Sequence, residues 1–241
     1  MPSVVTGVVM YPWAQAEQVL DGLREILLSG PDELTVQTAV AAGPDGGPTV
    51  MLLPTWCGDP EADGPVRALG RLGDPLAVQL DTMPLAAAVS GRDALFPNGR
   101  HVSIRTRPVA GLTPVISAAL MEAGAALPSP MSALSIHQFR NAATRVPVAD
   151  TAFGTREPHL TVEVIAVWPA GTDGTPHRAW ADSTSAKIAP HSLPGGYANM
   201  LAPDDTEQIA HAFGGNAARL LEIKARVDPD GVFTAIPLPK G

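Results

Sequence analysis

The stretch that most clearly predicts the fold is "LTVEVIAVW", residues 160–168. Its β-branched and aromatic residues favour a strand, and its length fits one buried in a sheet. A second strand is predicted just before it at Ala133–Phe139, and a helical pattern follows at His177–Ile188. The middle of the chain therefore predicts a sheet with a helix packed beside it.

The same alternation of strands and helices continues outward along the chain. Further strands are predicted at Val4–Tyr11, Leu34–Ala42, Thr49–Cys57, Leu76–Leu80 and His101–Arg107. Further helices are predicted at Ala14–Ser29, Glu61–Leu72, Leu85–Leu95, Thr113–Ala126 and Asp205–Arg226, the last one broken near Gly214. Several strands form hairpins, such as the pair joined by "GPDGGP". We therefore expect an α+β fold, with a mostly antiparallel sheet and helices packed on one face. No linker separates two domains, so residues 1–241 are predicted to form one domain.

Composition excludes several classes of function. The net charge is −8 and the basic residues are scattered, so we expect no nucleic-acid partner. Apolar runs are too short to span a membrane, and the first residues show no signal-peptide pattern. A single cysteine, Cys57, fits a reducing compartment, so we expect a cytoplasmic protein. The six histidines do not fall at metal-ligand spacing, and no metal site is predicted.

The stretch "AFGGNAARLLEIKARVDPDGVF", residues 212–233, predicts a helix with a sharp end. Pro229 cannot continue the helix, and Asp230-Gly231 favours a tight turn. We expect Val232 and Phe233 to fold back onto an apolar surface.

Two strand residues are candidates for polar chemistry. His137 lies on the same strand face as Ser135, and could act as a general base or simply be a hydrogen-bonded strand histidine. Glu163 interrupts the apolar strand and could face a pocket. Alternatively, Glu163 pairs with one of the arginines at 105, 107 and 140.

Tyr197 and Asn199 follow a Gly-Gly pair and would point to the same side of an extended segment. Such a pair can hydrogen-bond a flat heterocycle or brace a turn.

Three segments together resemble the berberine bridge enzyme-like FAD-linked oxidases: "ATRVPVADTAFGTREPHLTVEVIAVW", "GGYANMLAPDD" and "AFGGNAARLLEIKARVDPDGVF". The resemblance is to the carboxyl-terminal, substrate-domain half of that family. It covers essentially the whole chain, with residues 195–236 as the berberine-bridge closing segment. Its most specific motif is formed by Phe213, Gly214, Asn216, Leu220, Lys224, Asp228, Pro229 and Phe233.

The resemblance implies a sheet of about seven strands that covers a flavin ring. It further implies Tyr197 and His137 as catalytic residues, and Tyr197 and Asn199 as cofactor contacts. Substrate contacts are expected at Gln138, Glu163 and Arg105.

The resemblance also implies the substrate-binding half of an FAD-linked oxidoreductase, which oxidises a small organic substrate by hydride transfer to flavin. The phosphate-binding half is not in this sequence, so FAD is expected only with a complementing FAD-binding domain. That domain could be a separate chain, or this chain could be a truncated fragment of a longer reading frame. The alternatives are a cofactor-free small-molecule-binding protein, a cyclase or isomerase that reuses the fold, and a non-catalytic remnant that self-associates through its exposed sheet face.

Overall fold

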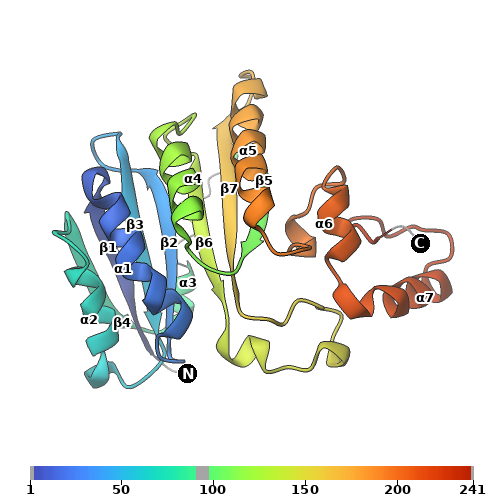
Figure 1. Ribbon diagram of the computed structural model, residues 1–241, viewed down its shortest axis with the longest axis horizontal. Helices are drawn as coiled ribbons and strands as arrows, with labels where there is room; N and C mark the ends of the chain where they lie inside the picture. The colour runs from blue at the N-terminus through green and yellow to red at the C-terminus, as the bar shows by residue number, and fades with distance from the viewer. Residues whose placement is uncertain (1–2, 91–97, 240–241) are drawn as a thin grey trace.

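Seven antiparallel strands form one sheet in the computed structural model, which describes residues 3–90 and 98–239 (Figure 1). Their order is β4-β1-β3-β2-β6-β7-β5. The strands are β1 (Val4–Pro12), β2 (Leu34–Ala42), β3 (Pro48–Trp56), β4 (Ala77–Met83), β5 (Arg100–Val109), β6 (Ala133–Phe139) and β7 (His159–Pro169). The expected α+β fold with an antiparallel sheet is confirmed.

Helices cover one face of this sheet. In Figure 1, α1 (Ala16–Ser29), α4 (Pro114–Ala125) and α5 (Thr175–Ile188) lie across the front, with α2 (Gly64–Ala68) beside β4. Alternate strand residues point toward these helices because successive side chains of a strand face opposite sides. In β7, Val162 and Val164 point this way and join the buried core. The opposite sheet face carries the residues of the other parity, including Glu163.

The strand order divides the sheet into two parts that are also consecutive in sequence. Residues 4–83 supply β4, β1, β3 and β2, and residues 100–169 supply β6, β7 and β5. The two parts meet at the ladder between β2 and β6, which runs from Thr38 opposite Ile136 to Ala41 opposite Ala133.

Some helices differ from the prediction. The expected helix at 61–72 is a series of short turns around α2, and α3 spans Leu85–Ser90, while residues 91–95 of the predicted helix lie outside the described parts. The carboxyl-terminal helical region is broken as expected, into α6 (Thr206–His211) and α7 (Ala217–Val227). No helix within 3–90 or 98–239 is long and apolar enough to cross a membrane.

The carboxyl-terminal segment is attached at the β5 edge of the sheet and extends away from it (Figure 1). The Gln208 side chain donates to the Thr106 carbonyl at 3.0 Å, and the Leu193 N–H donates to the Pro108 carbonyl at 2.7 Å. A small second apolar cluster, which includes Leu201, Ile209 and Phe213, lies within this segment. Backbone groups of the edge strand are therefore satisfied by the segment that follows.

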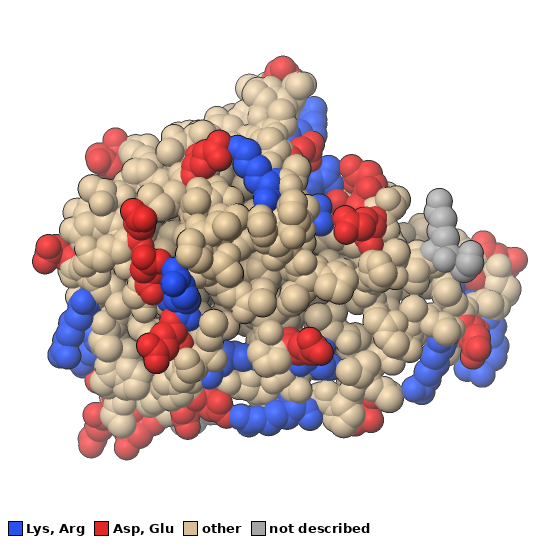
Figure 2. Space-filling view, in the orientation of Figure 1, with Lys and Arg blue, Asp and Glu red and all other residues tan. Residues whose placement is uncertain are grey.

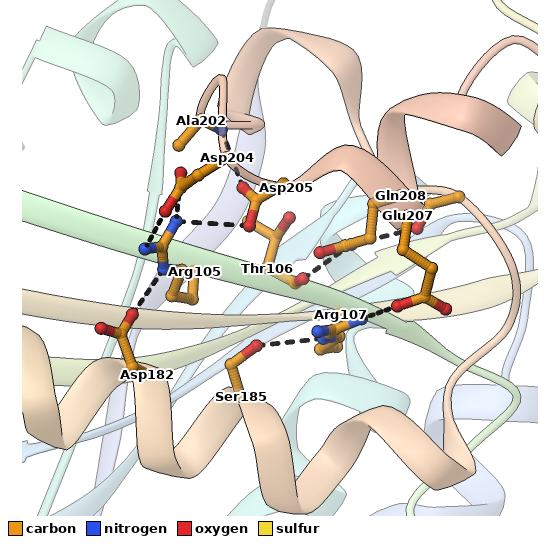
Figure 3. Close-up of polar contacts among 11 residues, drawn as sticks. Arg105, Thr106, Arg107, Asp182, Ser185, Ala202, Asp204, Asp205, Glu207 and Gln208 are labelled. Atoms are coloured by element: carbon orange, nitrogen blue, oxygen red, sulfur yellow. Dashed lines mark hydrogen bonds and ion pairs between the residues drawn. The ribbon is translucent and has the colours of Figure 1, made fainter. Parts of the chain in front are cut away.

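An arginine cluster adds to this attachment, as Figure 3 shows. The Arg105 guanidinium contacts Asp182 of α5 at 2.7 Å, Asp204 at 3.0 Å and Asp205 at 3.2 Å. The hydrogen bond from Arg105 holds the pKa of the Asp204 carboxyl below its ordinary value. One cation thus joins β5, α5 and the start of α6.

The turn after α7 corrects one expectation. Val232 and Phe233 do not fold back onto apolar residues, since they are 71% and 79% exposed. Their N–H groups donate instead to the Asp228 carboxylate at 2.8 and 3.1 Å, and Lys224 also binds this carboxylate. The Lys224 contact, above all, lowers the pKa of Asp228. The turn is therefore held by a carboxylate that accepts several hydrogen bonds.

Candidate functional site

A half-open cavity of about 540 Å³ lies on the sheet face that the helices leave uncovered. Its floor is formed by β6 and β7, one wall by the connection between these strands, and another wall by residues 196–200. Four of the predicted site residues border it: His137, Gln138, Glu163 and Tyr197. Segments far apart in the sequence therefore meet here.

His137 and Glu163 form the polar centre of the cavity. The His137 Nε2 atom lies 3.2 Å from Glu163 Oε2 and 3.0 Å from Ser135 Oγ. Ser135 and His137 alternate on β6, and Ser135 lies directly opposite Glu163 of β7, so all three share one face. Glu163 is only 8% exposed. A buried carboxylate needs a partner, and here that partner is a histidine rather than one of the arginines considered from the sequence.

Three side chains converge on His137 Nε2, because the Gln37 amide nitrogen lies 3.3 Å from this atom in addition to Glu163 and Ser135. The carboxylate only accepts hydrogen bonds and the amide nitrogen only donates, so both tautomers of His137 find a partner here. Nδ1 is the ring nitrogen outside this group of contacts.

Aromatic side chains form the apolar part of the cavity. The ring of Phe153 lies 5.2 Å from that of Phe139 and 6.2 Å from that of Tyr197. The guanidinium of Arg156 lies 5.0 Å from the centre of the Phe153 ring, a cation–π arrangement. Such a wall suits a flat or ring-shaped molecule.

His159 also lines the cavity and was not singled out from the sequence. Its ring stacks on Phe139 at 4.9 Å, and its Nδ1 atom lies 2.8 Å from the Glu157 carbonyl. Burial lowers the pKa of His159 below its ordinary value. The signal in the sequence was parity, because residues 159, 161 and 163 share one face of a strand.

Tyr197 and Asn199 contact each other, although Ala198–Met200 form a short 3₁₀ turn rather than the extended segment considered from the sequence. The Asn199 amide donates to the Tyr197 hydroxyl at 2.9 Å. Only Tyr197 of the two borders the cavity. The pair therefore places one aromatic ring at the cavity, and the hydroxyl of that ring accepts a hydrogen bond from Asn199, which lies outside the cavity lining.

Gln138 differs from its predicted role. It borders the cavity, but its Oε1 atom accepts from the Val36 N–H at 2.6 Å and its Nε2 atom donates to the Leu27 carbonyl at 2.7 Å. The side-chain amide thus continues the β2–β6 ladder beyond its last backbone pair, and its polar atoms are not available to a substrate.

Arg105 is the second correction. It lies opposite Val164 in the β5–β7 ladder, so its side chain points to the helix-covered face and not to the cavity. There it is occupied by Asp182, Asp204 and Asp205. The structure therefore removes Arg105 from the candidate substrate contacts.

The charged surface offers no competing site on the face shown in Figure 2, where acidic and basic side chains are interspersed. Within residues 3–90 and 98–239, no group of three or more potential metal ligands comes together.

Comparisons with known proteins identify the relatives of this chain. The family described as "Berberine and berberine like" matches residues 196–236. A curated relative, the FAD-linked oxidoreductase aurO of Gibberella zeae, is 25% identical over 244 residues, covering 97% of this chain and 47% of that protein.

Solved structures share the fold. BBE-like 28 from Arabidopsis thaliana superimposes with a TM-score of 0.79 at 17% identity, over 99% of this chain and 57% of that one. Berberine bridge enzyme from Eschscholzia californica gives a TM-score of 0.78 at 16% identity, over 99% and 55%. The chain thus spans about half the length of the relatives it matches. Residues 196–236 thus match the berberine and berberine-like family, and the chain as a whole shares its fold with berberine bridge enzyme-like proteins.

Proposed function

We propose that this chain is the substrate-binding half of an FAD-linked oxidase that oxidises a small organic molecule by hydride transfer to flavin. The cavity bordered by His137, Glu163 and Tyr197 is the proposed substrate site. The observation that carries the proposal is a buried carboxylate, Glu163, that holds a histidine at the floor of a cavity lined by aromatic rings. A residue so placed is a candidate for proton transfer.

The described residues fit only part of FAD. Tyr197 and Asn199 offer a ring and an amide beside the cavity, which suits one side of a flat heterocycle. The walls of the cavity carry no glycine-rich loop that opens a helix, the usual cradle for a pyrophosphate. We therefore propose that an FAD-binding unit, on this chain's own longer form or on a separate chain, holds the phosphates. When bound, FAD would supply the hydride acceptor.

The role of this chain is then to orient the substrate and to remove a proton. His137 Nδ1 would take a proton from a substrate hydroxyl, and Glu163 would stabilise the imidazolium that results. Tyr197, steadied by Asn199, would position the substrate ring and is the second candidate for the base.

The proposal is tested with the chain joined to an FAD-binding unit from the family. Anaerobic bleaching of the flavin absorbance would be followed with a panel of hydroxylated aromatic compounds and sugars. We expect His137→Ala to slow bleaching by roughly 100-fold while flavin content stays unchanged. His191→Ala, at an exposed position outside the cavity, is the matched control.

Two results would contradict the proposal. One is a His137→Ala protein that bleaches at the wild-type rate together with a Tyr197→Phe protein that does the same. The other is failure of the joined protein to bleach with every compound, despite full flavin content.

A cofactor-free binding protein is the second candidate, because the cavity is formed by residues of this chain alone. Flavin absorbance in protein purified together with an FAD-binding unit separates the two, since a cofactor-free protein would show none.

A further inference from the structure

His159 has one nitrogen committed to the protein and one left open. Its Nδ1 atom lies 2.8 Å from the Glu157 carbonyl, and a carbonyl only accepts, so Nδ1 carries the proton. Nε2 is therefore a hydrogen-bond acceptor. It makes no hydrogen bond with the residues that the structure describes. It is also not fully enclosed by them. It is thus accessible from the cavity that His159 lines.

The surroundings of His159 keep it in this state. The residue is only 7% exposed, and its ring stacks on Phe139 with the centres 4.9 Å apart. Burial disfavours the charged imidazolium and lowers the pKa of His159. Burial and the hydrogen bond at Nδ1 thus both favour the neutral ring with Nε2 as its acceptor.

The position of this acceptor relative to Glu163 limits the size of the ligand. His159 and Glu163 are four residues apart on one strand and share a face, which separates their backbones by roughly 13 Å. The aromatic wall of Phe139 and Phe153 lies at the His159 end of the cavity. A molecule that reaches both polar groups is longer than one ring and packs an aromatic part on this wall.

We propose that His159 is a specificity-determining residue, whose Nε2 accepts a hydrogen bond from a hydroxyl on the far ring of a fused or linked aromatic substrate. A hydroxyl donates to this atom, whereas a methyl ether or a keto group in the same place leaves it buried without a partner. The site therefore selects the hydroxylated compound over its methylated analogue. This assignment rests on the proposal that the cavity is the substrate site.

Binding of two matched probes, 2-naphthol and 2-methoxynaphthalene, tests the assignment without flavin. We expect the chain to bind 2-naphthol at least about tenfold more tightly by calorimetry near pH 7.5. His159→Phe keeps a ring to stack on Phe139 but has no acceptor, and should reduce the preference below about threefold. His191→Phe, the same change at an exposed histidine, should retain the wild-type preference.

A measurement on the unmodified protein covers the case in which His159→Phe does not fold. The ¹⁵N resonance of His159 Nε2 should move when 2-naphthol is added and stay in place when 2-methoxynaphthalene is added. Equal affinity for the two probes, no binding of either, or an unmoved resonance would each overturn the proposal. A hydroxyl preference in a protein that oxidises nothing when joined to FAD would instead contradict the proposed function alone.

Discussion

At the scale of single residues, neighbouring side chains on this sheet have different roles, one at the cavity and the other in holding the backbone. His137 and Gln138 are adjacent in β6, yet His137 faces the cavity while the amide of Gln138 binds the backbone of Val36 and Leu27. Period-two alternation places the two side chains on opposite faces. The chemistry of one and the structural role of the other follow from that single step along the strand.

Replacing Gln138 by Met should therefore destabilise the fold rather than alter a binding site. The change leaves the Val36 N–H without its partner and removes one of the two side-chain donors to the Leu27 carbonyl, the other being Arg140 at 3.4 Å. The lost bonds cost about 1–3 kcal/mol in the free energy of unfolding. Urea denaturation measures this loss, with Gln79→Met, at an exposed position of β4, as the matched control. A Gln138→Met protein as stable as the control would show that these two hydrogen bonds contribute nothing.

At the scale of elements, the Arg105 cluster links the carboxyl-terminal segment to the sheet. The strand β5 supplies the cation, α5 supplies Asp182, and the residues before α6 supply Asp204 and Asp205. Asp205 is the least exposed of these carboxylates, with 12% of its side chain accessible. The segment that carries Tyr197 is therefore positioned partly by ion pairs on the opposite face of the sheet.

Arg105→Met should loosen this segment while leaving the sheet intact. Ion pairs of this exposure contribute on the order of 1 kcal/mol, so amide exchange in residues 196–236 should become roughly fivefold faster. Arg71→Met, at an exposed arginine, is the control. Unchanged exchange in 196–236 would mean that the backbone bonds and the small apolar cluster hold the segment alone.

The Arg105 cluster also makes the attachment of the carboxyl-terminal segment depend on pH. The pKa of Asp204 is held below its ordinary value of 3.8, mainly by the hydrogen bond from Arg105. The folded state therefore binds fewer protons than the unfolded state in this range. The contribution of Asp204 is present above pH 3.8 and is lost as the pH falls through its folded pKa. In Arg105→Met this part of the acid sensitivity should be absent.

The elements could be predicted from the sequence more fully than the site. Strand and helix positions follow from local patterns, and the resemblance supplied the number of strands. The shared face of Ser135, His137 and Phe139 also follows from parity. The partners of Glu163, Gln138 and Arg105 could not be predicted, because they depend on which strands are neighbours and on which face the helices cover. The position of His159 on the same face as Glu163 could have been predicted from strand alternation.

At the scale of the whole molecule, the carboxyl-terminal segment carries an apolar surface that the other described residues do not cover. Val227, Val232, Phe233 and Ile236 are all exposed near the end of the carboxyl-terminal segment. Exposed groups of large apolar side chains commonly mark contact sites. This surface is consistent with the proposed FAD-binding unit as a partner.

Replacing two phenylalanines of the same segment distinguishes a ring that stabilises the fold from one that is exposed at this surface. Phe213→Ala removes a ring that is 8% exposed and should cost about 3 kcal/mol in the free energy of unfolding. Phe233→Ala removes one that is 79% exposed and should change this free energy by less than about 0.5 kcal/mol. Thermal unfolding of the isolated chain compares the two directly. A large loss in Phe233→Ala would mean that this ring packs within the chain.

The division of the sheet at the β2–β6 ladder has a consequence for synthesis on the ribosome. The four strands of residues 4–83 pair only with one another, apart from that one short ladder. They can pair as soon as they leave the exit tunnel, before the cavity-lining residues of β6 and β7 have left it. The strands that border the cavity then join this first part of the sheet through the β2–β6 ladder, so a mutation in that ladder would interfere with the joining of the two parts rather than with formation of the first.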